Sequence, residues 1–386
     1  MSLASPDPAR SIAPPTADEL RASFDGAPEL TVGLEEEVLL LAPETLELAP
    51  VARELIARTG GDPRFKLELP AAQLELVTRP HEGVPAAIRD LGEGRIALLR
   101  AADGLARPAA APVHPFSPRE GELLDEPRYR RTVEQFGRIA HRQIVSALQV
   151  HVAVGGADRT LAVYNALRSY LPELAALAAS GPFHEGVDSG LASIRPKISE
   201  ELLRQGIPPA IASWDDFACA LQWGARSGYL AEHAAWWWEL RPHPRWGTLE
   251  LRVPDAQATV SDAAAVAAVA HALVGWLAGR HDAGELLDCD PVWRIAENRW
   301  NACRYGVEGS VADLRSGVRT STRERLHALI GELGPTARRL GCEAELESAH
   351  AMADENGAIR QRAVARTGGV RGVAEWLAER FGAGLA

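Results

Sequence analysis

Four short stretches of the chain alternate between apolar and polar residues in the way that predicts β-strands. They cover residues 31–38, 73–78, 147–154 and 247–253. Because strand side chains point to opposite faces with period two, each stretch can bury one row and expose the other. In the last three stretches the apolar row is mostly Leu and Val. The other row holds Glu75, Gln149, His151, Glu250 and Arg252. The pattern predicts an open sheet with one face on the core and one polar, chemically active face.

The stretch at residues 31–38 differs from the others because it contains three consecutive glutamates. Alternation puts Glu35 and Glu37 on one face, whereas Glu36 falls among apolar side chains and needs a salt-bridge or backbone partner there. Carboxylates that gather on one sheet face repel one another unless cations lie between them. We therefore interpret Glu35 and Glu37 as hard oxygen ligands for Mg²⁺ or Mn²⁺. The alternative is an exposed acidic edge strand, although such an edge usually carries Lys beside Glu.

The other polar residues also have two interpretations each. Glu75 alone could be solvated, and Gln149 with His151 could line a polar strand face beneath a loop. Glu250 and Arg252 could form a surface ion pair of little energetic weight. In the functional interpretation Glu75 and Glu250 join the metal ligands. His151 then contacts a metal or a phosphate, and Arg252 binds a phosphate or carboxylate through its planar guanidinium.

The rest of the chain alternates between strand and helix signals in an order that is not a regular β-α-β repeat. It therefore favours an α+β fold over a doubly wound parallel sheet. Asp158 and Ser261 are candidate helix N-caps, and Pro172 is expected to kink or break its helix. Strands are expected at 30–41, 66–78, 107–113, 146–154, 235–241 and 247–253. Helices are expected at 84–105, 126–142, 158–180, 214–228, 261–280, 291–304, 321–333, 336–350 and 371–382.

Composition narrows the function classes. Residues 1–28 are rich in Pro, Ala and Ser and are expected to form a flexible tail, followed by a single domain over 29–386. The formal net charge of −11 argues against a nucleic-acid-binding surface. The four cysteines are widely spaced and form no CxxC motif, which fits a reduced cytoplasm. The N-terminus lacks the apolar run of a signal peptide. The apolar run at 263–279 is short for a membrane span, and we interpret it as a buried helix.

Two further segments are candidates for binding. The loop at 180–197 is dense in Gly, Ser, Asp and Arg, which is typical of binding loops, although it could be a mere connector. Trp236–Trp238 could shape a substrate pocket or pack into the core on both faces. The sequence contains neither GxxxxGK[ST] nor a strand-linked GxGxxG. A bound nucleotide would therefore be held by metal ions and arginines rather than by a glycine-rich loop.

A series of short motifs resembles the bacterial carboxylate–amine ligases, the second type of glutamate–cysteine ligase. The motifs follow one another in order from about residue 30 to residue 365, which is nearly the whole chain. The ordered set carries the resemblance, since any one motif alone is weak. The motifs are Gly33–Glu37, Glu75–Thr78, Val113–Phe116, Gly186–Arg195, Arg241–Pro244, Thr248–Val253, Arg299–Gly306 and Glu355–Arg362.

The resemblance implies a glutamine synthetase-like fold, in which a concave antiparallel sheet forms a funnel and helices pack on its outer face. It implies ATP-dependent joining of a carboxylate, typically the γ-carboxyl of glutamate, to an amine such as that of cysteine. The implied route is an acyl phosphate, and the implied cofactors are ATP and Mg²⁺ or Mn²⁺. The resemblance also suggests a homodimer that acts on small molecules, with no nucleic-acid or membrane partner.

The resemblance also implies roles for individual residues. The family usually carries His-Val-His-Val where this chain has Gln149–Val152, so Gln149 takes the place of the first histidine. An impaired nucleotide- or metabolite-binding paralogue is therefore one alternative, and another divalent-metal enzyme such as an amide hydrolase is a second. The implied roles are metal ligation for Glu35, Glu37, Glu75 and Glu250, cofactor contacts for Gln149, His151, Arg241 and Arg304, and catalytic contacts for Arg195 and Arg252.

Overall fold

The main sheet of the computed structural model, which describes residues 14–229 and 236–385, is antiparallel throughout. Its strand order is β2-β3-β1-β5-β9-β8, and β4 also pairs with β1. These strands are β1 (Val32–Leu41), β2 (Phe65–Leu67), β3 (Gln73–Val77), β4 (Arg107–Ala109), β5 (Leu148–Ala153), β8 (Leu240–His243) and β9 (Thr248–Leu251). Two hairpins lie outside it: β6 (Phe183–His184) with β7 (Val187–Asp188), and β10 (Ser310–Ala312) with β11 (Arg319–Ser321). The mixture of helices with an antiparallel sheet agrees with the predicted α+β class.

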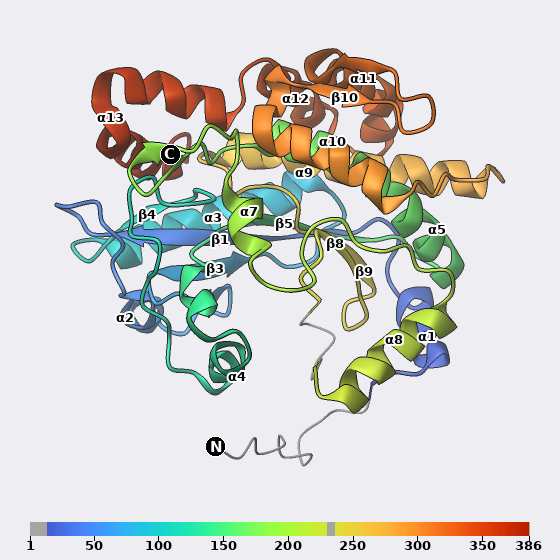
Figure 1. Cartoon of the computed structure of the whole chain (residues 1–386), viewed down its shortest axis with the longest axis horizontal. Coiled ribbons are helices and arrows are strands. Elements are labelled where there is room, and N and C mark those ends of the chain that lie inside the picture. The colour runs from blue at the N-terminus through green and yellow to red at the C-terminus, as the bar shows by residue number, and fades with distance from the viewer. Residues whose placement is uncertain (1–13, 230–235, 386) are drawn as a thin grey trace.

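Helices cover one face of this sheet in two layers (Figure 1). The apolar rows of the strands, such as Leu148, Val150 and Val152 of β5, are fully buried in the core on this side. The inner layer is α3 (Val84–Ala102) and α9 (Val260–Asp282). Above or beside it lie α5 (Ala157–Leu167), α6 (Leu171–Ala178), α10 (Val292–Tyr305), α11 (Thr322–Arg339), α12 (Glu343–Asp354) and α13 (Gly357–Phe381). Helix α9 is long and apolar enough to cross a membrane, but it is mostly buried here, as its interpretation as a core helix requires.

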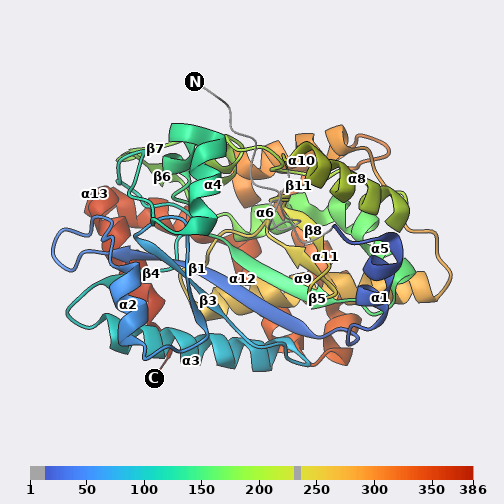
Figure 2. The same cartoon turned by 90° about the horizontal axis from the view of Figure 1, so that it is seen from below.

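The opposite face of the sheet carries the polar rows. Seen from below, β1, β3 and β5 are visible between the ribbons of the surrounding helices (Figure 2). Those helices are α1 (Ala17–Asp25), α2 (Ala52–Arg58), α4 (Pro127–Phe136), α8 (Trp214–Ser227) and the short α7 (Arg195–Ser199). The sheet therefore has one apolar face against the helical layers and one polar face, whose side chains Glu75, His151 and Glu250 are largely buried.

The later part of the expected N-terminal tail at 1–28 is helical, which corrects the prediction for residues 17–25, whereas residues 1–13 lie outside the described part of the chain. Thr16 and Glu19 form a capping box at the start of α1, in which each side chain bonds to the backbone of the other residue. Leu20 and Phe24 are fully buried, and the Phe24 ring stacks on Trp214 of α8 at 4.7 Å between centroids. Helix α1 is therefore part of the folded body rather than a free tail.

Three other predicted boundaries concern prolines, of which two interrupt an element and one does not. The strand expected at 66–78 is two strands, β2 and β3, with Pro70 between them. The helix expected at 158–180 is divided into α5, a 3₁₀ turn at Arg168–Tyr170, and α6, whose first turn contains Pro172. That break was predicted. In contrast, α11 continues past Pro335 to Arg339, where a break was expected.

Helix starts also differ from the sequence predictions. The N-cap of α5 is Gly156 rather than Asp158, and the N-cap of α9 is Thr259 rather than Ser261. Helix α13 begins at Gly357, well before the expected residue 371, and contains a non-helical residue at Gly369. Trp236–Trp238 precede β8 and are not in a strand, whereas residue 235 lies outside the described part of the chain. The hairpin connection from Pro242 to Gly247 joins β8 to β9 as predicted.

Candidate active site

The strand register brings the polar rows of neighbouring strands together on the polar face of the sheet, opposite the helical layers. Residues that lie directly opposite each other in an antiparallel pair project from the same face of the sheet. The predicted site residues are opposed in this way on five consecutive strands, from β3 to β8. The opposed pairs are Glu75 with Glu37, Glu35 with Gln149, His151 with Glu250, and Glu250 with Arg241. The structure therefore places Glu35, Glu37, Glu75 and Glu250 on one face, as the alternation predicted.

A compact group of three potential metal ligands lies in the middle of this face. Glu35, His151 and Glu250 each offer one ligand atom, and these atoms lie within 4.8 Å of one another. His151 Nε2 is 3.5 Å from a Glu35 oxygen, and it is buried without a hydrogen-bond partner among the described residues. The other ring nitrogen is 3.0 Å from the Thr248 hydroxyl, which fixes the ring. An unpaired imidazole nitrogen beside two carboxylates suits a divalent cation.

A second acidic group, made up of Glu37, Glu68 and Glu75, lies next to the first and has raised pKa values. Burial and the neighbouring charges of Glu35 and Glu68 raise the pKa of Glu75 well above its usual range, although Lys66 lies 3.5 Å away. Burial and the charge of Glu37 raise the pKa of Glu68 to about 7. Burial also raises the pKa of Glu37. Cations stabilise buried carboxylates of this kind. This group could therefore contact a metal ion that carries a polyanion, or the ammonium group of a substrate.

Glu250 has the opposite electrostatic environment. Burial alone would raise its pKa, but Arg241, Arg252 and His151 outweigh burial and hold the pKa well below the usual range. Arg241 binds both carboxylate oxygens, with distances of 2.6 and 3.1 Å, and Arg252 donates to one of them. Glu250 is therefore held ionised and in one orientation. The same pattern operates at Glu35, where the contact and charge of His151 overcome burial and lower the pKa to about 2.

Gln149 connects the two acidic groups. Its Oε1 accepts from Arg252 Nη1 at 2.6 Å, and its Nε2 donates to Glu37 at 3.0 Å. Because a guanidinium only donates and a carboxylate only accepts, these partners fix the orientation of the amide. Glu37 also accepts from the Ala147 backbone at 2.6 Å. The amide oxygen of Gln149 is thus engaged by an arginine, which the sequence could not indicate.

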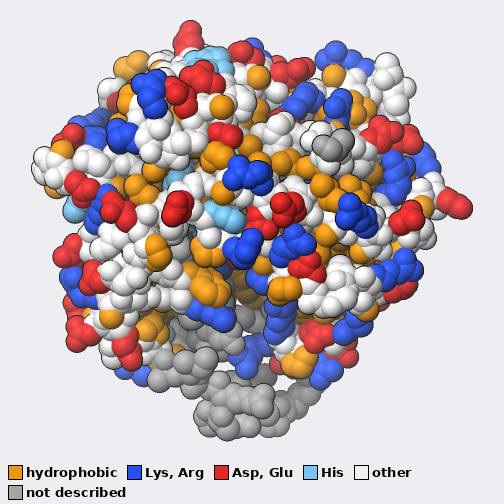
Figure 3. All heavy atoms as spheres, turned by 180° about the vertical axis from the view of Figure 1, so that it is seen from behind, with side chains coloured by type: hydrophobic (Ala, Val, Ile, Leu, Met, Phe, Trp, Pro, Cys, Tyr) orange, Lys and Arg blue, Asp and Glu red, His pale blue; other side chains and the backbone are white. Residues whose placement is uncertain are grey.

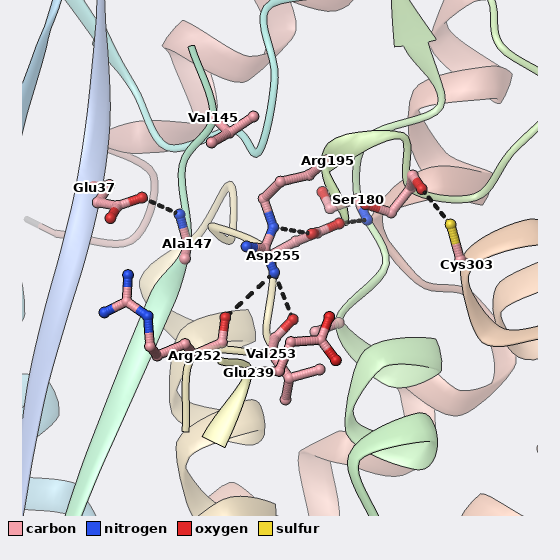
Figure 4. A network of polar contacts seen from close by, with 12 residues as sticks. Glu37, Val145, Ala147, Ser180, Arg195, Glu239, Arg252, Val253, Asp255 and Cys303 are labelled. Atoms are coloured by element: carbon pink, nitrogen blue, oxygen red, sulfur yellow. Dashed lines mark hydrogen bonds and ion pairs between the residues drawn. The ribbon is translucent and has the colours of Figure 1, made fainter. Parts of the chain in front are cut away.

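A pocket of about 960 Å³, part of it open solvent, adjoins this network. Three of its lining residues, Glu37, Arg195 and Arg252, are labelled in Figure 4. Glu37 and Glu68 supply carboxylates to the lining, and the other lining side chains include aromatic, apolar and amide groups. The pocket is lined by Glu37, Glu68, Tyr129, Gln143, Val145, Arg195, Leu202, Trp237, Glu239 and Arg252, among others.

Arg195 reaches the pocket from the start of α7, but much of its guanidinium is already occupied. Nε donates to Asp255 at 2.7 Å, and Nη2 donates to the Val253 carbonyl at 2.6 Å (Figure 4). Asp255 also accepts from the Ser180 backbone at 2.8 Å. Arg195 therefore ties the loop at 180–197 to the chain after β9, and its contact with a substrate stays a prediction.

The motif at 299–306 supports this region from the outer layer. Arg299 forms a buried ion pair with Glu239, which lines the pocket, and the Cys303 thiol donates to the Ser193 carbonyl at 2.9 Å. Arg304 packs on the Tyr305 ring at 5.0 Å from its centroid, on α10, and it is neither in the metal-ligand group nor among the pocket-lining residues described. Arg304 lies beside Gly190 of the loop at 180–197, and its contact with a cofactor stays a prediction.

Sequence reasoning missed several pocket residues. Glu239 and Tyr129 carry no periodicity or motif signal of their own, and only the later Arg299 motif could have pointed to a partner for Glu239. Trp237 was a candidate for shaping a pocket, and it does line one. Glu68 is separated from β3 by Pro70, so alternation along β3 could not place its side chain, and the structure puts it beside Glu37 and Glu75.

Sequence comparisons identify relatives along nearly the whole chain. The sequence model of glutamate–cysteine ligase family 2 matches residues 31–376. The Rubrobacter xylanophilus protein named "Putative glutamate–cysteine ligase 2-3" is 39% identical over 364 residues, which cover 92% of this chain and 98% of the relative. The Thermobifida fusca protein named "Putative glutamate–cysteine ligase 2" is 33% identical over 371 residues, which cover 94% and 93%.

Solved structures show the same fold at low sequence identity. The glutamate–cysteine ligase of Francisella tularensis in complex with AMP superposes with a TM-score of 0.65 at 12% identity, covering 92% of this chain and 90% of that one. A bifunctional glutathione synthetase from Pasteurella multocida gives 0.63 at 16% identity, covering 95% of this chain and 54% of that one. From the family match and its close relatives, the chain belongs to glutamate–cysteine ligase family 2 and is an ATP-dependent ligase.

Proposed function

We propose that the chain joins a carboxylate, typically the γ-carboxyl of glutamate, to an amine such as that of cysteine, in a funnel-like site of the glutamine synthetase type. The observation that supports this most directly is the group of potential metal ligands, Glu35, His151 and Glu250, beside a pocket that is lined by Arg252 and by buried carboxylates. ATP and a carboxylate are both anions, so a reaction between them requires positive charge between them. The polar face of the sheet offers ligands for the cations that would supply this charge.

The charge and position of each residue suggest its role in this reaction. Glu35, His151 and Glu250 would hold Mg²⁺ or Mn²⁺, with Glu37 and Glu75 on the adjoining part of the face. The ion supplies charge neutralisation between the phosphates and the carboxylate when it is bound. Arg252 contacts Glu250 of the metal-ligand group and also lines the pocket. There it can stabilise the negative charge on the phosphoryl group in the transition state of its transfer.

The proposed reaction has two balanced steps. A carboxylate oxygen attacks the γ-phosphorus of ATP, and ADP leaves with the bonding pair, which produces an acyl phosphate. The amine nitrogen then attacks the acyl carbon, phosphate leaves with the former carboxylate oxygen, and the nitrogen loses a proton to form the amide. Phosphorylation is needed because a carboxylate oxygen is otherwise a poor leaving group at neutral pH.

Oxygen labelling tests this reaction. With ¹⁸O in the carboxylate of glutamate, the label should appear in the released phosphate, and ADP should form only when ATP, Mg²⁺, acid and amine are all present. Release of AMP and pyrophosphate, or amide formation without label transfer, would exclude the acyl phosphate. Nucleotide binding without turnover on a panel of acids and amines would instead indicate an impaired paralogue, and ATP-independent amide hydrolysis another metal enzyme.

We expect Gln149→His to lower turnover and to leave Mn²⁺ affinity unchanged. The imidazole cannot span Glu37 and Arg252 as the longer amide does, so one of these charged groups loses a partner, at a cost of about 1–3 kcal/mol. Calorimetric titration of Mn²⁺ together with steady-state rates measures both effects. The contrary result is tighter Mn²⁺ binding with faster turnover, which would make position 149 a metal-ligand position after all.

The assembly and location of the protein are also proposals. The family resemblance supports a homodimer in the cytoplasm, and the widely spaced cysteines fit that compartment. Light scattering on the purified chain would test the dimer directly.

A further inference from the structure

A pair of histidines lies far from the sheet, where α11 packs against α12 in the helical layer. His327 is on α11, and His350 is on α12. Their Nδ1 atoms are only 2.6 Å apart. The space-filling view shows histidine side chains beside acidic ones along its upper edge, over the layer of helices (Figure 3). Neither histidine contributes to the polar sheet face or the pocket described above.

The two rings meet end to end. Their centroids are 4.9 Å apart and their planes differ by 15°, and the centroid distance exceeds the Nδ1 distance by about one ring width. Each outer nitrogen faces a carboxylate. His327 Nε2 is 3.0 Å from Asp354 Oδ1, and His350 Nε2 is 3.8 Å from Glu347 Oε2. The arrangement is carboxylate, imidazole, imidazole, carboxylate, with both Nδ1 atoms at the centre.

This order of groups favours a cation at the centre. A neutral imidazole has one N–H and one bare nitrogen, and an adjacent carboxylate favours the N–H on its own side. Asp354, at 3.0 Å, therefore favours a bare Nδ1 on His327. Glu347, at 3.8 Å, is beyond hydrogen-bond distance and acts on His350 through its charge alone. The 2.6 Å contact between the two Nδ1 atoms then needs a positive centre between them, either a proton carried by His350 or a shared metal cation.

We propose that His327 and His350 bind a transition-metal ion such as Zn²⁺ or Ni²⁺ through their Nδ1 atoms. Imidazole nitrogens suit these ions, whereas Mg²⁺ prefers oxygen ligands, so this site differs in chemistry from the carboxylate-rich sheet face. Asp354 and Glu347 orient the rings, as carboxylates commonly do behind metal-bound histidines. The two side chains are 36% and 34% exposed, so water can complete the coordination. Metal–nitrogen bonds of about 2.0–2.1 Å place two ligand nitrogens roughly 3 Å or more apart, so the Nδ1 atoms must separate from 2.6 Å and the rings must turn toward the ion.

Calorimetry with ZnCl₂ in the presence of excess Mg²⁺ tests the site on the full chain. The wild-type protein should bind one equivalent of Zn²⁺ that is absent from His327→Asn and from His350→Asn. Asp354→Asn should retain this equivalent with about tenfold to hundredfold weaker affinity, because only ring orientation is affected. His151→Asn should keep it too, which separates the pair from any Zn²⁺ bound on the sheet face.

His281→Asn is a matched control, because His281 is also about one-third exposed and next to a carboxylate, Asp282, at 3.4 Å. It should bind Zn²⁺ like the wild type. Circular dichroism of each variant shows whether it is folded, and surface positions such as these should tolerate asparagine. Equal Zn²⁺ uptake by the wild type and both pair variants, or no uptake by any of them, would mean that the rings share only a proton and would overturn the proposal.

Discussion

Replacement of Glu35 by glutamine is expected to lower ATP-dependent turnover by at least about a hundredfold while the protein stays folded. The carboxylate of Glu35 is one of three ligand groups within 4.8 Å, and it faces the unpaired Nε2 of His151. Glutamine keeps the size of the side chain but removes the charge that a divalent cation needs. The rate of ADP release with saturating ATP, Mg²⁺, glutamate and cysteine measures the effect.

A control variant and a metal titration show whether the loss of turnover in Glu35→Gln comes from lost metal binding. Glu29→Gln removes a largely exposed carboxylate whose partner, Arg159, is mostly buried and keeps its ion pair with Asp282, so its turnover should match the wild type. Mn²⁺ titration of Glu35→Gln should show weakened binding in parallel with the lost rate. Full activity in Glu35→Gln, or lost activity with unchanged Mn²⁺ binding, would contradict a metal-ligand role for this residue.

Strand alternation was sufficient to predict which side chains share a face of the sheet. The face of a residue depends only on whether its position within the strand is odd or even. Glu35 and Glu37 on one side and Glu36 on the other follow from that rule, and the pairing with β3 and β5 bears it out. The same rule predicted that Glu36 needs a buried partner. It could not name Arg95, which lies on a different element and reaches Glu36 only after α3 packs on the sheet.

The motifs marked individual arginines but did not indicate which residues those arginines contact. Arg195 and Arg299 both carry motif signals, yet in this structure Arg195 binds Asp255 and Arg299 binds Glu239. Both arginines position pocket-lining segments through contacts between residues distant in sequence. Such contacts depend on how elements dock, and a linear pattern has no information on docking. The carboxylate partner Glu239 left no signal at all.

The helix at Ala17–Asp25 was missed for a different reason. Proline-rich composition dominated the interpretation of residues 1–28, although Thr16 and Glu19 have the spacing of a capping box. The buried row of this helix is only Leu20 and Phe24, which is too short for a clear helical period. Its stability comes from packing on α5 and α8, which local sequence cannot show.

Arg95→Leu is expected to give the largest loss of stability of any single change, about 3–5 kcal/mol. Arg95 is fully buried, and its five N–H groups reach Glu36 and three backbone carbonyls. Two of those carbonyls belong to Gln257 and Ala258, before α9, and the third to Phe381 at the end of α13. The change leaves the Glu36 carboxylate buried without its counter-charge. Urea or thermal unfolding followed by circular dichroism measures the loss.

A second substitution distinguishes charge burial from lost packing. If the stranded carboxylate is the main cost, Glu36→Leu combined with Arg95→Leu should be more stable than Arg95→Leu alone, because replacing both partners of a buried pair removes the uncompensated charge. The exposed ion pair of Arg58 with Glu54 is the matched surface case, and Arg58→Leu should cost no more than about 1 kcal/mol. A double variant no more stable than Arg95→Leu would instead assign the cost to the three carbonyl contacts, which join α3 to the segment before α9 and to the end of α13.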